Sequence, residues 1–139
     1  MAIKQKHIVI TEGDYGRLQS LIESSRQFRQ RDRMYLDALE QELNRAVIAK
    51  HTDIPRDVVT MNSRVRVKDL NSGHEFVYEI VFPRDADVAK NRISVLAPIG
   101  TALLGYGAGA KIEWQVPSGI RRFRILDVQY QPRAETAAA

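Results

Sequence analysis

Two kinds of hydrophobic spacing divide the chain. Up to about Lys50, apolar residues recur every three or four positions, which is typical of amphipathic helices. From about Val58 onward, apolar and polar residues alternate, which is typical of strands with one buried face. The sequence therefore predicts an α+β protein with a helical N-terminal part followed by a β-sheet domain.

The N-terminal part predicts two helices joined by a short link. After an extended run over residues 7–10, Thr11 is a suitable N-cap and Asp14 a capping-box partner, so we expect helices over residues 12–27 and 32–50. Their apolar stripes are formed by Tyr15, Leu18 and Ile22 and by Leu36, Leu39, Leu43 and Ala46. Matching stripes favour a short antiparallel hairpin, a coiled coil with arms of about 25 Å. The alternative is that both stripes pack on the β-domain instead of on each other.

A proline separates the two parts of the chain. Pro55 blocks the continuation of a helix and favours an extended conformation at Ile54, so residues 51–57 are expected to form a linker. We therefore expect a helical hairpin over residues 1–53, a β-domain over residues 54–132 and a disordered tail over residues 133–139.

The β-domain predicts five strands and one short helix. The strands are expected over residues 64–70, 75–82, 92–97, 111–116 and 120–130, with turns at 71–73 and 117–119. Pro98 is well placed in the first turn of a short helix, which Gly105 would end. On the last strand the apolar side changes after Ile125, which indicates a β-bulge or a strong twist there.

Composition limits the class of protein. The chain has 139 residues, of which 44% are hydrophobic and 27% are charged, and it contains no cysteine. These values are ordinary for a soluble globular protein, and they exclude disulfides and thiolate metal sites. Residues 1–6 contain no apolar segment typical of a signal peptide, and no apolar run approaches the ~20 residues that a membrane helix needs. We therefore expect a cytoplasmic protein without membrane contact.

No motif for catalysis or for a cofactor is found. The histidines His7, His51 and His74 lie in different elements without zinc-binding spacing. The glycine-rich segment 105–109 precedes a strand and lacks the lysine of a phosphate-binding loop, so it predicts a turn. We therefore expect no catalytic residue, metal, cofactor or small-molecule substrate, and no enzymatic activity. A buried acid–base pair would not be visible at this level.

Positive charge gathers in two arginine clusters, in a chain with a formal net charge of +4. Four arginines and a single acid, Asp32, lie at and around the predicted link between the helices, and three more arginines lie on the last strand. The residues are Arg26, Arg29, Arg31 and Arg33 in the first cluster, and Arg121, Arg122 and Arg124 in the second. With Phe28 among the first cluster, a weak contact with nucleic acid is one interpretation. A solvated basic surface is the other, and both stay open.

Three segments resemble a known family. Residues 97–105 (APIGTALLG), 117–119 (PSG) and 125–130 (ILDVQY) together resemble the C-terminal domain of the bacterial Gre transcript-cleavage factors. Residues 57–65 (DVVTMNSRV) look like the smaller relative in that family named regulator of nucleoside diphosphate kinase. The resemblance covers nearly all of residues 54–132, in the family's order.

The resemblance implies a fold and a partner. It implies an FKBP-like domain, in which one short helix packs against a curved antiparallel sheet, and docking on RNA polymerase at the rim of its secondary channel. The family's docking contacts include the loop that here reads LAPI, so Ala97, Pro98 and Ile99 are the docking candidates. The competing interpretation is that Ile99 and Leu103 only close the core.

One departure from the family changes the expected function. Gre factors that stimulate cleavage have a longer hairpin, and acidic residues at its tip help to hold a magnesium ion in the polymerase. Here the predicted hairpin is short and its tip is basic, and a cation repels Mg²⁺ and supplies no oxygen ligand. We therefore expect a polymerase-binding regulator that does not stimulate cleavage and competes with Gre factors.

Three alternatives remain at this stage. The first is a transcription elongation factor with Gre-like anti-arrest activity. The second is an FKBP-like prolyl isomerase, with an apolar pocket floored by Tyr106 and Trp114. The third is direct nucleic-acid binding through the arginine clusters, which predicts an affinity that falls steeply with salt.

Overall fold

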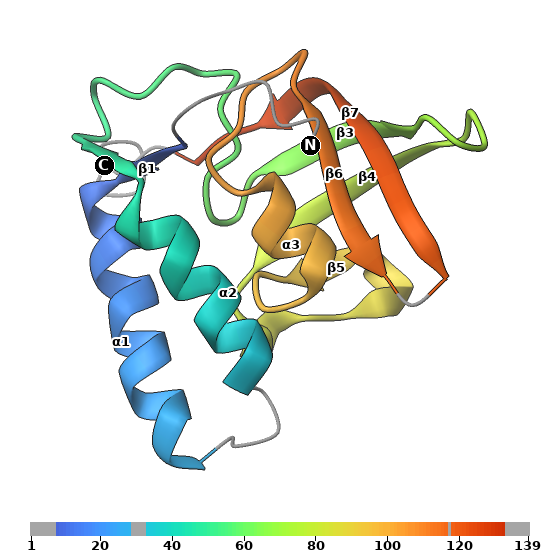
Figure 1. The fold of residues 1–139 in the computed structure, drawn as a ribbon. Helices are drawn as coiled ribbons and strands as arrows, with labels where there is room; N and C mark the ends of the chain where they lie inside the picture. The colour runs from blue at the N-terminus through green and yellow to red at the C-terminus, as the bar shows by residue number, and fades with distance from the viewer. Residues whose placement is uncertain (1–7, 29–32, 117, 133–139) are drawn as a thin grey trace.

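The computed structural model describes residues 8–28, 33–116 and 118–132, and its N-terminal part contains two helices that lie side by side (Figure 1). The chain forms β1 (Val9–Thr11), α1 (Glu12–Phe28), α2 (Arg33–Asn44) and β2 (Val47–Ala49). β1 and β2 pair in parallel. Thr11 caps α1 as predicted, because its Oγ1 accepts a hydrogen bond from the N–H of Asp14 at 3.1 Å.

Two details of the helical prediction are wrong. The second helix ends at Asn44 rather than near Lys50, because the β-branched residues Val47 and Ile48 form β2 beside β1. The capping box is also wrong in its second half. The Asp14 carboxylate does not turn back to Thr11 but accepts hydrogen bonds from Arg17 at 2.7 Å and from the N–H of Met61 at 3.0 Å.

The β-domain contains a five-stranded sheet in the order β5-β4-β3-β7-β6. Its strands are β3 (Arg64–Asp69), β4 (Glu75–Val81), β5 (Arg92–Ser94), β6 (Lys111–Val116) and β7 (Gly119–Tyr130). All neighbouring pairs are antiparallel except β4 and β5, which are parallel. The expectation of an antiparallel sheet is therefore wrong for this pair. The connection through two short 3₁₀ turns, Pro83–Asp85 and Val88–Lys90, returns the chain to the same direction.

The predicted bulge in the last strand is confirmed. Val67 of β3 lies opposite Ile125, but its neighbour Arg66 lies opposite Asp127, so Leu126 is the extra residue on β7. The bulge keeps Ile125 fully buried and turns the carboxylate of Asp127 toward Arg66, whose Nη2 donates to it at 2.7 Å.

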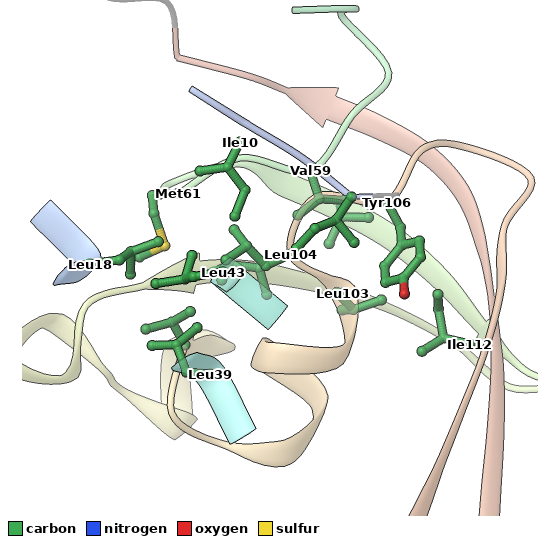
Figure 2. Packing of buried hydrophobic residues seen from close by; sticks show 14 of the residues in the cluster. Ile10, Leu18, Leu39, Leu43, Val59, Met61, Leu103, Leu104, Tyr106 and Ile112 are labelled. Carbon is green, nitrogen blue, oxygen red and sulfur yellow. The ribbon is translucent and has the colours of Figure 1, made fainter. Parts of the chain in front are cut away.

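One hydrophobic cluster runs through the helices and the β-domain. Figure 2 shows Leu18, Leu39 and Leu43 of the helices beside Met61 and Leu104 of the β-domain. α1 contacts α2, and α2 also contacts α3 (Pro98–Leu103), which lies against the sheet. The helical stripes therefore pack both on each other and on the β-domain.

Candidate docking site

The three docking candidates lie where α3 begins. Ala97 is the N-cap residue of α3 in an extended conformation, and Pro98 opens the helix. Pro98 is exposed, whereas Ile99 is half-buried and packs against the hydrophobic cluster. Pro98 is therefore available to a partner, while Ile99 contributes to the core as well as to the surface.

The loop before α3 is held in one shape by hydrogen bonds. The Ala97 N–H donates to the Ser94 carbonyl at 2.9 Å, and the Leu96 N–H donates to Ser94 Oγ at 3.0 Å. The buried Thr101 hydroxyl donates to the Val95 carbonyl at 2.5 Å. Gly100 completes the arrangement, because a Cβ at this position would overlap the Ser94 carbonyl oxygen. The loop therefore presents Pro98 in a preformed conformation.

A pocket of about 240 Å³ lies between α2, α3 and β6, next to this loop. Leu96 and Pro98 of the loop line it, together with Tyr35 of α2 and Trp114 of β6. Tyr106 lines it too, as the predicted apolar pocket requires, but Tyr106 is only 1% exposed. The loop and the pocket thus form one mainly apolar surface, which we call the docking surface.

Tyr106 and Trp114 are held by their surroundings. Burial raises the pKa of the Tyr106 hydroxyl, and Arg45 of the helical part donates a hydrogen bond to it at 3.1 Å. The indole of Trp114 packs on the ring of Phe123, with 5.0 Å between centroids. Both side chains therefore have structural roles on the wall of the pocket.

Tyr35, which was not among the candidates predicted from the sequence, lines the docking surface and is 44% exposed. Its neighbour Met34 is 74% exposed. Neither belongs to the stripe of Leu36, Leu39 and Leu43 that faces the core. The sequence did carry a signal for a contact surface here, because two large apolar residues lie next to each other outside the core stripe of the helix.

The basic hairpin tip is only partly described. Arg29 and Arg31 lie outside the described residues, and Arg33 is exposed at the start of α2. Arg26 donates hydrogen bonds to Asp37 at 3.0 Å and to Glu40 at 2.5 Å, so it joins α1 to α2. The hydrogen bond to Asp37 is the largest cause that raises the pKa of Arg26. The positive charge of Arg26 is therefore balanced by two carboxylates of α2, and Arg26 links the two helices instead of adding to an unpaired basic tip.

The second arginine cluster is divided between different environments. Arg121 pairs with the buried carboxylate of Asp69 and lies over the ring of Phe123, 5.6 Å from its centroid. Arg122 pairs with Glu113 at 2.8 Å. Arg124 lies opposite Lys68 and Lys111 on the neighbouring strands. The three basic positions of this cluster therefore do not form one patch.

In the parts of the chain that the structure describes, no three His, Cys, Asp or Glu side chains are grouped so that they could hold a metal ion. Among the described helices, none has the length and apolar character needed to cross a membrane.

Comparison with known proteins identifies the family. The model for "Transcription elongation factor, GreA/GreB, C-term" matches residues 54–130, and the model for "Rnk N-terminus" matches residues 6–48. The regulator of nucleoside diphosphate kinase from Escherichia coli (strain K12) is 41% identical over 99 residues, which cover 70% of this chain and 73% of that protein.

Gre factors are similar over a smaller share of their length. GreA from Clostridium botulinum (strain Eklund 17B / Type B) is 40% identical over 91 residues, which cover 66% of this chain but only 57% of that protein. Among solved structures, a GreA/GreB elongation factor from Nitrosomonas europaea has a TM-score of 0.72 and 42% identity. The match covers 91% of this chain and 100% of that one. The chain therefore belongs to the GreA/GreB family, in the group that joins an Rnk N-terminus to the GreA/GreB C-terminal domain.

Proposed function

We propose that this protein is a transcription regulator that binds RNA polymerase at the rim of the secondary channel through its docking surface. The observation that carries the proposal is the exposed Pro98 on a preformed loop, at the position that the family resemblance assigns to docking. Membership of the GreA/GreB family supports the choice of partner.

The pocket beside the loop extends the proposed contact. Tyr35, Pro98 and Trp114 come from three different elements and line the same hollow. An apolar side chain of the polymerase that entered it would bury surface against all three, and aromatic residues in such pockets commonly contribute much of the binding energy. Contact with α2 as well as α3 would also fix the direction in which the helical part points.

We further propose that the protein does not stimulate transcript cleavage. α1 has 17 residues and α2 has 12, so at ~1.5 Å per residue the helices reach only about 25 and 18 Å. Near the free end of the helices, the carboxylates of Asp37 and Glu40 both accept from Arg26. They are thus engaged with a cation instead of being available as Mg²⁺ ligands. Such a protein would occupy the Gre site and compete with Gre factors.

The prolyl isomerase alternative is not supported. The matched families are named as transcription factors and regulators. Tyr106 is almost fully buried, and α2 forms one wall of the pocket that a peptide would have to enter.

The experiment is capture of core RNA polymerase by the immobilised full-length chain, with two matched proline variants. Pro98→Glu should weaken capture at least tenfold, because a carboxylate would be desolvated in an apolar contact. Pro55→Glu changes another exposed proline outside the docking surface and should bind like the wild type. If Pro98→Glu binds as well as the wild type, the docking assignment is wrong. If the wild type is not captured at micromolar concentration, the proposed partner is wrong.

A cleavage assay on stalled elongation complexes tests the second half of the proposal. Added alone, the protein should not accelerate transcript cleavage, and added with a Gre factor it should slow the factor's reaction. Acceleration by the protein alone would support the alternative of a Gre-like anti-arrest factor.

A further inference from the structure

Three cations form a row across the sheet. Lys68 of β3 lies opposite Arg124 of β7, and Arg124 lies opposite Lys111 of β6. Because neighbouring strands are about 4.8 Å apart, the row extends about 10 Å across the three strands. We call Lys68, Arg124 and Lys111 the basic row.

The basic row lies on the face of the sheet opposite to the hydrophobic core. The adjacent residues Val67, Ile125 and Ile112 are buried in the core, and side chains alternate between the two faces of a strand. The three cations are partly exposed. α3 contacts β6 from the core side, and Figure 1 shows α1, α2 and α3 on the same side of the sheet. The basic row is thus on the outer face, away from the docking surface.

The acidic residues near the basic row are paired with other arginines. Glu75, which faces Lys68 across the strands, accepts from Arg66 at 2.8 Å, and Asp127 accepts from the same guanidinium at 2.7 Å. Glu113 accepts from Arg122 at 2.8 Å. Among the ion pairs found between described residues, none includes a member of the basic row. These carboxylates are therefore shared with Arg66 and Arg122, and the cations around the row outnumber them.

Like charges directly opposite each other on neighbouring strands destabilise a sheet. The sheet nevertheless has two such pairs, one on each side of Arg124, and an anionic partner bound across them would turn the repulsion into favourable contacts. A line of cations on one face of a sheet fits a chain of phosphates, which neutralises several charges at once.

An aromatic residue at the other end of the same face narrows the class of partner. Tyr130 is 52% exposed and lies opposite Arg64, whose guanidinium is 5.9 Å from the ring centroid. Arg64 is four residues from Lys68 on β3, which is about 13 Å along the strand. Unpaired bases stack on exposed aromatic and guanidinium groups, whereas the bases of a duplex are already stacked and paired.

We propose that the outer face of the sheet binds a single-stranded nucleic acid, with its phosphates on the basic row and a base against Tyr130. The face is distinct from the docking surface, so the interaction does not depend on the proposed polymerase contact. A protein held on one side by its docking surface would still present this face to a nearby single strand.

The test measures binding of the full-length chain to labelled 15-nucleotide RNA and DNA of mixed sequence by fluorescence anisotropy, over a range of salt concentrations. The triple variant Lys68→Gln, Arg124→Gln, Lys111→Gln should bind at least tenfold more weakly at low salt. Loss of three phosphate contacts should reduce the slope of log K against log salt by about 2. Tyr130→Ala should weaken binding about fivefold or more.

The matched control is Arg56→Gln, Arg84→Gln, Lys90→Gln, which removes the same charge from exposed positions outside the outer face. It should retain most of the affinity. Equal weakening by the control would show a general charge effect and overturn the proposal. No salt-dependent binding by the wild type would overturn it as well.

Further binding measurements with other polymers distinguish which class of molecule binds, and whether it is RNA or DNA. Equal affinity for a duplex would contradict the assignment to single strands, and equal affinity for poly-glutamate would point to an acidic protein instead. The stronger of the RNA and DNA signals identifies the source. Thermal melting of each variant confirms that the fold is retained, and removal of the repulsion should not lower Tm.

Discussion

The carboxylate of Asp14 accepts a hydrogen bond from the backbone N–H of Met61, 3.0 Å away, and so joins the first turn of α1 to the segment that leads into β3. Asp14 is 5% exposed, and Met61 is 1% exposed in the hydrophobic cluster. A second link runs from the Val9 N–H to the Gly105 carbonyl at 3.1 Å. The helical part is thus fixed to the β-domain by polar contacts as well as by the core.

Removal of the Asp14 carboxylate should destabilise the protein. Asp14→Ala leaves the buried Met61 N–H without its acceptor and removes a favourable negative charge from the N-terminus of α1, so we expect a loss of about 2–3 kcal/mol in the free energy of unfolding. Urea denaturation measures it. Glu23→Ala, at an exposed position of the same helix, should change stability by no more than about 0.5 kcal/mol. Similar losses in both variants would contradict a specific role for the Asp14–Met61 contact.

Two glycine-to-alanine substitutions should have opposite effects. At Gly100 the added methyl group would overlap the Ser94 carbonyl, and the docking loop must move, so we expect a loss of about 1–3 kcal/mol and weaker polymerase capture. At Gly16, on an accessible part of α1, no atom lies within 4 Å of the added carbon, so the better helix propensity of alanine should raise stability by about 0.5–1 kcal/mol. Thermal melting of both variants checks the signs. A stable Gly100→Ala protein with normal capture would show that the loop shape is not required.

Local patterns predicted most elements of the fold because each depends on neighbours in the chain. The strict alternation over residues 111–116 matches β6, and the change of apolar side after Ile125 matches the bulge at Leu126. The end of α2 was not predictable in this way. Residues 47–49 were expected in the helix but pair with β1, which lies about forty positions earlier in the chain. No local pattern in the sequence reveals that contact.

The candidate site was predictable only in part, for a related physical reason. Pro98 could be identified by its place at a helix start and by the family resemblance. The three arginines of the last strand lie in different environments because each has a different neighbour on another strand. Arg121 pairs with Asp69 and Arg122 with Glu113, whereas Arg124 lies opposite Lys68 and Lys111. Arg26 was likewise expected to be an unpaired cation at the tip, but it forms ion pairs with Asp37 and Glu40. Only the packing of α1 on α2 brings these two carboxylates near it.

The bridge made by Arg26 should be sensitive to salt. Arg26→Ala removes one exposed and one partly buried ion pair between the helices, so the protein should melt at a slightly lower temperature than the wild type at low ionic strength. The difference should largely disappear at about 1 M salt, where the screening length is only about 3 Å. Melting curves at the two salt concentrations measure it, with Lys90→Ala as the control at another exposed cation. A difference that persists at high salt would show that Arg26 acts through packing of its side chain rather than through charge.

The buried Asp69 should make stability depend on acid pH. Burial alone would raise its pKa, but hydrogen bonds from the Asn71 N–H at 2.8 Å and from Arg121 bring the pKa below its ordinary value of 3.8. The folded state therefore binds the proton less readily than the unfolded state. The stabilisation is fully present above the unfolded pKa and is lost as the pH falls through the lower, folded pKa.

Asp69→Asn tests this linkage directly. At pH 7 the variant should lose about 1–3 kcal/mol of unfolding free energy, because the charge-assisted bond to Arg121 is gone and the turn keeps only a neutral acceptor. As the pH falls below 3.8, the unfolded wild type takes up the proton first, so the difference between the two proteins should shrink. Urea denaturation across this range measures the difference, and Asp85→Asn, at an exposed carboxyl, should stay within about 0.5 kcal/mol throughout. A gap between wild type and Asp69→Asn that does not change with pH would mean that Asp69 stabilises the turn by its shape, since protonation would then make no difference.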